Sequence, residues 1–273
     1  MNTLTIMTYN MLHAPGDRLN ELTSVVSGVA PDILACQEIT DVPGFLSLCH
    51  STGMHGVLAH ANGPEVMETD LDKDLSSYKL EHVGLLSRYP IVRFEAHKGD
   101  PRVMFRSILE AWIEVPNFGL IQFFALHFRA FPGPPHALFK VREAQVLSAL
   151  LRRAGNSDLL CVLGDFNAWV RGEGYDMTDQ MTRYPSDHLE AVQGGVTDLI
   201  LKTGLEDVWR KMGVPPEKAP GTLRDRPNST VDHVFVTPSL GNLVTDVQLV
   251  HDDLSRKASD HFPLLARFVQ PHQ

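Results

Sequence analysis

The sequence lacks any uninterrupted apolar run approaching the roughly 20 residues that a membrane-spanning helix needs. It contains only three cysteines, an odd number that cannot all pair within one chain, and Cys36 and Cys161 lie in apolar runs that suit free thiols. The chain runs directly from Met1 into the strand-like LTIMTYN, without the basic and apolar regions of an export signal. We therefore expect a protein of a reducing compartment, the cytoplasm, with no transmembrane segment.

Basic charge is also in deficit. The chain has 24 Lys and Arg residues against 33 Asp and Glu residues, which gives a net charge of -9. Tight non-specific binding to DNA or RNA depends on basic side chains that neutralise phosphates, so long nucleic acid is a poor partner. Local basic positions remain at Arg142, Arg152, Arg153, Arg224 and Arg226, and these leave a short phosphorylated substrate open.

Apolar segments recur from residue 4 to residue 269, with no repeat, low-complexity tract or long linker between them. We therefore expect one domain over residues 1–273. Runs rich in Val, Ile and Phe predict strands at 3–9, 32–37, 82–88, 107–115, 119–127, 158–164, 231–237, 243–250 and 263–269. The helical spacing of apolar residues predicts helices at 18–29, 136–154 and 188–203. This order of elements indicates a layered α/β protein.

Polar residues able to bind metal ions or phosphate stand at the ends of these predicted strands. They are Asn10, Glu38, His127 and Asp165 directly after four strands, and Asp232, Asp260 and His261 at or just before the start of two others. The end of one strand and the start of its antiparallel neighbour share an edge of a sheet. All these side chains can therefore converge on one edge.

Such a convergence would bring carboxylate and amide oxygens together with two imidazoles. Mg²⁺ and Mn²⁺ prefer hard oxygen ligands, and imidazole exchanges protons near neutral pH. A strand-end Asp or Asn taken alone is more often a turn or cap residue, but so many at one edge favour a shared site. The sequence therefore predicts a phosphoester-cleaving site that uses Mg²⁺ or Mn²⁺.

The motifs that carry these residues follow one another along nearly the whole chain. They are TYNML with Asn10, PDILACQE with Glu38, GLLSRYP, ALHFRA with His127, LGDFNA with Asp165 and Asn167, TVDHVFVTP with Asp232, and SDHFPLLA with Asp260 and His261. In content and order they resemble the motifs of the endonuclease/exonuclease/phosphatase superfamily. Its members include deoxyribonuclease I, abasic-site endonucleases, neutral sphingomyelinases and inositol polyphosphate phosphatases.

The resemblance implies a deoxyribonuclease I-like α/β fold. This is a four-layer α/β/β/α sandwich of two packed, mixed β-sheets flanked by helices, with the active site at one end. It also implies metal ligands: Glu38 as the principal ligand, supported by Asn10, with Asp260 beside the metal.

The same resemblance implies catalytic roles. Asp165 and Asn167 would hold the attacking water or the phosphate, and His127 would stabilise charge on the phosphoryl oxygens. His261 would serve as general base or phosphate ligand, oriented by Asp232. Whether His261 or Asp165 takes the proton of the water stays open at this point.

Two positions distinguish the chain from abasic-site endonucleases of this superfamily. Those enzymes carry an Asp where this chain has Leu12 and a Tyr where it has His127. Both differences favour the branch similar to deoxyribonuclease I and sphingomyelinase over DNA repair. In the deoxyribonuclease-like branch a Glu near the position of Glu81 orients the histidine, so Glu81 is a further catalytic candidate. The alternative is an ordinary strand-start residue that faces solvent.

Arg88 and Arg129 are candidate substrate-binding residues, because a guanidinium group offers a bidentate fork to phosphate. Surface salt bridges would explain both residues equally well. The loop from residue 128 to residue 139 follows His127 directly and is rich in Pro and Phe. It could form a wall of the site or an ordinary packed connection.

The leading functional hypothesis is hydrolysis of a phosphodiester or phosphomonoester by in-line attack of water, on a small or phospholipid-like substrate. The main alternative is a nuclease that acts on short or single-stranded nucleic acid. A catalytically silent binding module is a third possibility, but it should have lost a ligand or an imidazole, and all of them are present.

Overall fold

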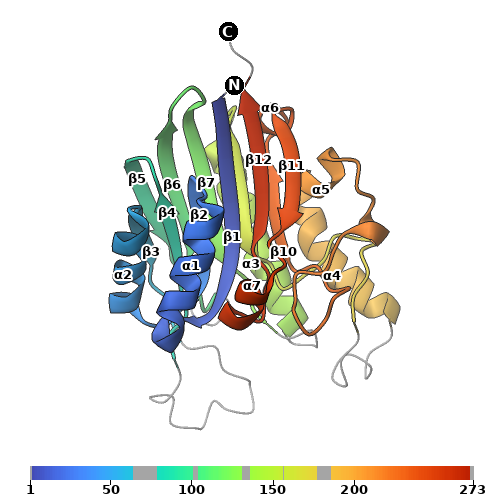
Figure 1. Cartoon of the computed structure of the whole chain (residues 1–273). Coiled ribbons are helices and arrows are strands. Elements are labelled where there is room, and N and C mark those ends of the chain that lie inside the picture. The colour runs from blue at the N-terminus through green and yellow to red at the C-terminus, as the bar shows by residue number, and fades with distance from the viewer. Residues whose placement is uncertain are drawn as a thin grey trace.

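The computed structural model describes residues 2–63, 79–100, 104–130, 136–155, 157–176 and 186–270, with the backbone alone for 186–192. Two mixed six-stranded sheets pack face to face in the middle of the molecule (Figure 1). The first sheet has the order β11 (Val244–Leu249), β12 (Leu264–Gln270), β1 (Asn2–Ala14), β2 (Ile33–Ile39), β4 (His82–Ser87) and β3 (His55–Ala59). The second has the order β5 (Ile91–His97), β6 (Ile108–Val115), β7 (Gly119–His127), β8 (Leu160–Asp165), β10 (Asp232–Val236) and β9 (Glu206–Asp207).

Helices cover the outer face of each sheet. On the first sheet these are α1 (Leu19–Val29), α2 (Val42–Thr52) and α7 (Asp253–Ala258), which lie in front of the strands in Figure 1. On the second sheet they are α3 (His136–Ala154) and α4 (Ser186–Leu201), behind the strands in the same view. The short helices α5 (Val208–Lys211) and α6 (Pro238–Gly241) lie near β9 and β10. The expected four-layer α/β/β/α sandwich is confirmed.

The buried apolar residues divide into three clusters, one for each interface between layers. The cluster between the two sheets includes Ile6, Phe123 and Val234. The cluster under α1 and α2 includes Tyr9, and the cluster under α3 and α4 includes Val162. Successive side chains of a strand point to opposite faces, so central strands with apolar residues on both faces can serve two interfaces. This accounts for continuously apolar runs such as that of β8.

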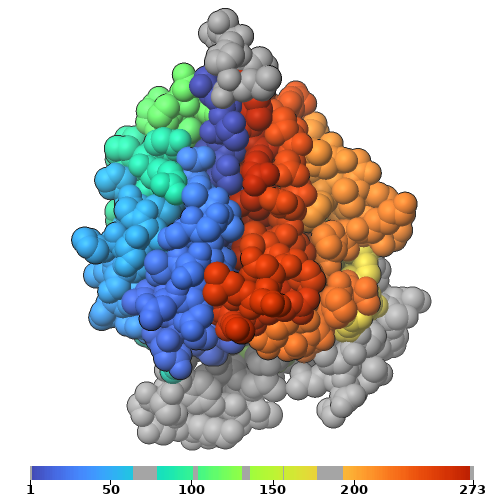
Figure 2. Space-filling view, in the orientation of Figure 1, coloured from blue at the N-terminus to red at the C-terminus, as the bar shows by residue number. Residues whose placement is uncertain are grey.

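The predicted strands and helices correspond to observed elements within a few residues at each end. The sequence did not predict α2, whose first turn contains Pro43 and Gly44, the short helices α5, α6 and α7, or the strands β3, β5 and β9. The first and last strands are hydrogen-bonded neighbours, since Asn2 pairs with Gln270. Their blue and red surfaces accordingly lie side by side in Figure 2. Among the described helices, none has the length and hydropathy of a membrane span.

Candidate active site

At one end of the sandwich, polar side chains take over the inward-facing positions of the strands. In β8, the inward Leu163 is followed two residues later by Asp165. The same alternation brings Asn10, His127 and Asp232 to the inward face of β1, β7 and β10. The strand register places Asp165 directly between His127 on one side and Asp232 on the other. The predicted convergence of these residues is therefore confirmed.

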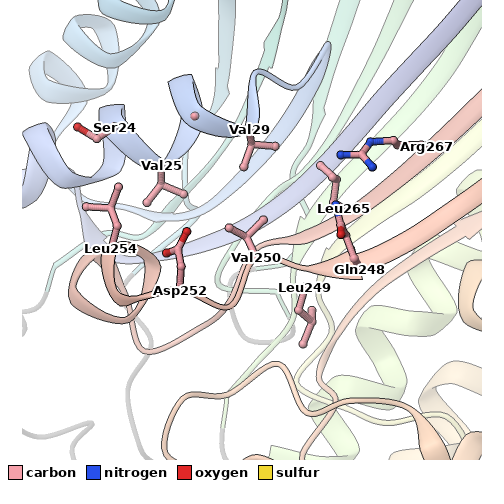
Figure 3. A pocket seen from close by; sticks show the side chains of 11 residues that line it. Ser24, Val25, Val29, Gln248, Leu249, Val250, Asp252, Leu254, Leu265 and Arg267 are labelled. Atoms are coloured by element: carbon pink, nitrogen blue, oxygen red, sulfur yellow. The ribbon is translucent and has the colours of Figure 1, made fainter.

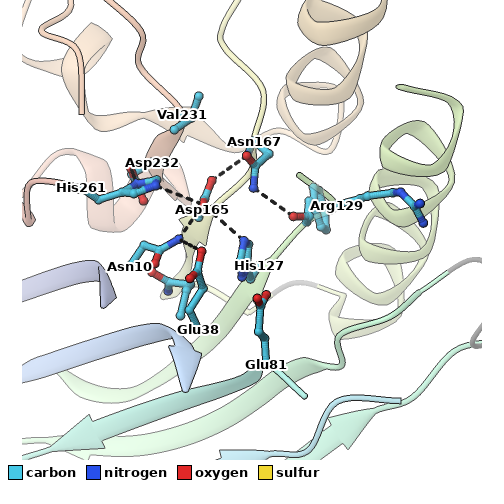
Figure 4. A network of polar contacts seen from close by, with 12 residues as sticks. Asn10, Glu38, Glu81, His127, Arg129, Asp165, Asn167, Val231, Asp232 and His261 are labelled. Carbon is cyan, nitrogen blue, oxygen red and sulfur yellow. Dashed lines mark hydrogen bonds and ion pairs between the residues drawn. The ribbon is translucent and has the colours of Figure 1, made fainter. Parts of the chain in front are cut away.

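Asn10 joins the two sheets at this end. Its amide nitrogen donates to Glu38 Oε1 at 2.9 Å and to Asp165 Oδ2 at 3.0 Å (Figure 4). Its carbonyl oxygen accepts the backbone N–H of Leu12 at 3.0 Å. With all of these bonds made and the side chain fully buried, Asn10 fixes the separation of the two carboxylates.

The local backbone of β2 explains why Glu38 points into the site. Glu38 has a positive φ of 59°, and the pairing of β2 with β4 shifts register between Cys36 and Ile39. Such a bulge re-aims a side chain that strict alternation would send to the other face. Burial raises the pKa of Glu38, the neighbouring Glu81 raises it further, and the hydrogen bond from Asn10 opposes the rise. The charged form of Glu38 is therefore disfavoured at this position.

His261 is held by Asp232. Its Nδ1 lies 2.8 Å from Asp232 Oδ2, and its Nε2 lies 3.9 Å from Asp165 Oδ2. Burial by itself lowers the pKa of this imidazole, but the charge and hydrogen bond of Asp232 outweigh burial. With the further charges of Asp165 and Asp260, the pKa of His261 is raised to about 10. The side chain is therefore an imidazolium at neutral pH.

Asp165 has the opposite character. Burial, followed by the charge of Asp232, raises its pKa to about 7 against the lowering effects of His261 and Asn10. The backbone N–H of Asn167 donates to Asp165 Oδ1 at 2.8 Å, and the Asn167 side chain donates to the main-chain oxygen of Phe128, directly after β7, at 3.1 Å. The LGDFNA segment is thus tied to β7. Its carboxylate can gain or lose a proton near neutral pH.

His127 lies beside Asp165. Its Nε2 is 3.4 Å from Asp165 Oδ2, while burial, followed by Arg106 and His261, lowers its pKa well below the usual value. His127 is therefore neutral. Its Nδ1 is buried and makes no hydrogen bond among the described residues.

The expectation that Glu81 orients His127 is wrong. Glu81 lies at the site but binds Arg106, whose Nε donates to Glu81 Oε2 at 3.0 Å, and its other oxygen lies 3.4 Å from His13 Nδ1. The guanidinium of Arg106 offers a stronger, charged partner than a neutral imidazole. Glu81 nevertheless borders Glu38, as its effect on the pKa of Glu38 shows.

The two arginines expected to bind substrate lie elsewhere. Arg88 follows β4 at the end opposite the site, because β4 runs antiparallel to β2, and its Nε donates to the Pro31 carbonyl at 3.0 Å. Arg129 is 1% exposed, with its guanidinium over the Phe105 ring and its Nε donating to His136 at 2.6 Å. In Figure 4 its side chain runs away from the cluster. The expectation is wrong for Arg88, whereas Arg129 is a buried, packed side chain whose expected role in binding substrate stays a prediction. Residues 131–135 of the loop expected to form either a wall of the site or a packed connection lie outside the described residues.

Asp260 is partly exposed at the rim. Ser259 Oγ lies 3.4 Å from Asp260 Oδ1 and donates to the Asn10 main-chain oxygen at 2.7 Å. Asp260 is therefore placed close to Asn10 through Ser259. Its expected place beside a metal remains a prediction.

Three residues of the site were missed by sequence reasoning: His13, Arg106 and Lys140. Arg106 stands just before β6, much as Asp232 stands at the start of β10, but a single Arg at a strand start does not by itself indicate a site. Lys140 on α3 is 1% exposed and donates to the Asn167 carbonyl at 2.8 Å. His13 lies in an irregular part of β1 that no periodicity predicts.

Two groups of side chains at this end have the composition and spacing of metal ligands. They are His13 with Glu38 and Glu81, and Asp165 with Asp232 and His261; in each, the potential ligand atoms lie within 4.8 Å of one another. Acidic residues therefore cluster where the sequence predicted a metal ion. The second group already contains an imidazolium between two carboxylates, so the first is the better cation site.

A separate cavity of about 380 Å³ lies on the outer side of the first sheet (Figure 3). It is bordered by α1, the end of β11 and the start of α7, with Val25, Leu254 and Arg267 among its lining residues. None of the polar residues of the candidate site lines it. This cavity is not part of the predicted chemistry.

Comparison with known proteins identifies a matching family and similar structures. The sequence model described as "Endonuclease/Exonuclease/phosphatase family" matches residues 7–261. No curated protein matches the chain.

Similar solved structures include an AP endonuclease from Archaeoglobus fulgidus (TM-score 0.74, 19% identity, 97% of this chain and 99% of that one). They also include the 3' phosphatase NExo from Neisseria bound to a product DNA hairpin (0.70, 19%, 98% and 100%). A third is TDP2 from D. rerio complexed with a single-strand DNA product (0.67, 15%, 99% and 100%). At these identities the likenesses show a shared fold.

Proposed function

Because this chain belongs to the endonuclease/exonuclease/phosphatase family, we propose that it is a divalent-metal-dependent hydrolase of phosphoesters. The family comprises hydrolytic nucleases and phosphatases, as its name states. The observation that carries the proposal for this chain is the single network of Glu38, Asn10, Asp165, His261 and Asp232 at one end of the sandwich. The network brings the carboxyl groups of Glu38, Asp165 and Asp232 together with the imidazolium of His261. The neutral imidazole of His127 lies 3.4 Å from Asp165.

The donor set fits Mg²⁺ or Mn²⁺. Glu38 is partly buried next to another carboxylate, a position that disfavours its charge and where a bound cation would stabilise it. Glu38 would hold the ion, with Asn10 fixing its carboxylate and Asp260 at the rim. When bound, such an ion withdraws charge from the phosphate and favours attack by water.

Asp165 is the better candidate for general base. A base must be unprotonated to accept a proton, and the pKa of Asp165, raised to about 7, suits operation near neutral pH. His261, with its pKa raised to about 10, already carries its proton and serves instead to bind phosphoryl oxygens. We therefore propose Asp165, and not His261, as the group that takes the proton of the water.

His127 and Asn167 complete the phosphate-binding surface. Neutral His127 has one ring nitrogen that can donate a hydrogen bond, and its Nε2 is directed toward Asp165. The side chain of Asn167 is fixed by its hydrogen bond to the Phe128 carbonyl, and Lys140 donates a hydrogen bond to the main-chain carbonyl of Asn167. Preorganised donors of this kind stabilise charge that develops on phosphoryl oxygens.

A small phosphorylated molecule is the proposed substrate. The net charge of -9 weakens electrostatic attraction to a long polyanion, whereas a single phosphate needs only the local positive groups of the site. No comparison supports a phospholipid-like substrate. Cys36, Cys49 and Cys161 are buried free thiols, which supports a reducing compartment such as the cytoplasm.

A nuclease acting on short or single-stranded nucleic acid is the second candidate function. It is favoured by the similar structures that hold DNA products. A short strand adds few phosphates, so it does not require an extensive basic surface. A silent binding module is disfavoured, because the network of candidate catalytic residues is complete.

The test is a substrate panel with nucleotides, oligonucleotides, sugar phosphates, phospholipids and an aryl phosphodiester, in Mg²⁺ or Mn²⁺. We expect hydrolysis of at least one class, and its loss with a chelator, with Glu38→Ala and with His261→Ala. Asp165→Ala, which removes the proposed general base, gives the background rate of hydrolysis for each substrate. His55→Ala is the matched control, because His55 begins β3 at the edge remote from the site and is exposed. Full activity in His261→Ala would show that the assigned chemistry is wrong.

A further inference from the structure

The first strand is irregular where it enters the site. Leu12 and His13 both have positive φ angles, of 50° and 52°, and the pairing of β1 with β2 shifts register between Asn10 and Ala14. A non-glycine residue with positive φ is uncommon, and two in succession are costly. Such strain is retained where a side chain must be aimed in a particular direction.

The side chain so aimed is that of His13. Its Nδ1 lies 3.4 Å from Glu38 Oε2 and 3.4 Å from Glu81 Oε1. Its backbone N–H also donates to Glu38 Oε2 at 3.1 Å. The imidazole is 47% exposed while the two carboxylates are 15% and 16% exposed. Solvent ions can therefore reach the point where the three groups meet.

The two carboxylates are each anchored through the oxygen that does not face His13. Asn10 donates to Glu38 Oε1, and Arg106 donates to Glu81 Oε2. The oxygens directed at His13 are thus Glu38 Oε2 and Glu81 Oε1. Arg106 is 5% exposed, so the orientation of Glu81 is fixed from the protein interior.

We propose that His13 and Glu81 join Glu38 as ligands of the catalytic cation, which makes this a mixed imidazole and carboxylate site that prefers Mn²⁺ or Co²⁺ to Mg²⁺. The inference rests on the proposed function for the presence of a cation. Separations of 3.4 Å suit neighbouring ligands of one ion, which bind at roughly 2.1 Å. Mg²⁺ selects oxygen ligands, whereas imidazole nitrogen favours transition metals.

The test is pulsed EPR spectroscopy of Mn²⁺ bound to the full-length protein. Wild type should show a directly bound nitrogen, and ¹⁵N-histidine labelling should change that coupling. The coupling should disappear in His13→Gln, which places an amide in place of the imidazole, and persist in the matched control His55→Gln. A wild-type spectrum without bound nitrogen, or a coupling that survives in His13→Gln, would overturn the proposal and leave His13 as an ion-pair partner.

Equilibrium dialysis gives a second readout. The dissociation constant for Mn²⁺ should rise by about tenfold or more in His13→Gln, while that for Mg²⁺ changes less, because the glutamine oxygen suits Mg²⁺. Glu81→Gln should weaken the binding of both ions. Equal losses for the two ions in His13→Gln would contradict the proposed selectivity.

The two proposals fail in distinguishable ways. A His13 nitrogen bound to Mn²⁺ in a protein that hydrolyses nothing in the panel would support this inference and contradict the proposed function. Hydrolysis that depends on Glu38, without any bound nitrogen, would do the reverse.

Discussion

At the residue scale, the central feature is a row of three titratable groups with different protonation at neutral pH. His127 is neutral, Asp165 titrates near neutrality and His261 is charged, because each has a different balance of burial and neighbouring charge. Opposite environments only a few ångströms apart are typical of sites where acid and base roles are divided. The strand register that sets Asp165 beside both His127 and Asp232 produces this division.

This arrangement predicts a bell-shaped dependence of kcat/KM on pH. Asp165 must be ionised to act as base, so the rate should rise with pH through about 7. His261 must be protonated, so the rate should fall as pH rises through about 10. Steady-state rates between pH 5 and pH 11 would check both limbs.

Asp232→Asn serves as the control for this profile. It removes the charge that raises the pKa of His261, so the alkaline limb should move to lower pH. A limb that stays in place would show that another group controls it.

At the element scale, the close approach of β7 and β8 positions two of the catalytic side chains. Gly164 is the residue that permits it: its φ is 153°, and a Cβ there would lie 2.1 Å from the Leu126 carbonyl oxygen. The next residue on β8 is Asp165, and the next on β7 is His127. The absence of a side chain at Gly164 thus determines the distance between them.

Gly164→Ala should therefore destabilise the protein by about 2 to 4 kcal/mol and reduce activity, because the two backbones must separate. Chemical denaturation and kcat measured on the same preparation would check this. Gly195→Ala is the matched control. Gly195 lies inside α4, where an added Cβ meets nothing within 4 Å, so that variant should be neutral or more stable by about 0.5 to 1 kcal/mol.

At the scale of the whole molecule, charge distinguishes the two candidate substrates. Binding of a polyanion releases counterions and weakens steeply with salt, whereas binding of one phosphate changes little. Turnover of a small phosphomonoester should therefore vary by less than about twofold between about 50 and 200 mM KCl, and cleavage of an oligonucleotide should fall on the order of tenfold. Initial rates over this range for both substrates would decide which one the negatively charged protein favours.

Much of the fold could be predicted because its central strands are buried on both faces. The strand β8, for example, is apolar up to its last residue, Asp165, so both the strand and the polar residue at its end can be recognised in the sequence. α2 was missed because Pro43 and Gly44 resemble a turn, although Pro suits the first turn of a helix, which here is capped by Asp41. β5 was missed because most of its side chains are exposed and give no burial pattern.

The sequence by itself determined the layered α/β fold and the strand-end residues Asn10, His127, Asp165 and Asp232, because strand alternation is a local property of the chain. Only the tertiary structure decided which partner each charged side chain takes. In the folded protein Glu81 binds Arg106 and not His127, Arg88 lies at the end of β4 remote from the site, and His13 faces Glu38. Those outcomes depend on bulges, register and contacts between segments far apart in the chain, for which no local pattern exists.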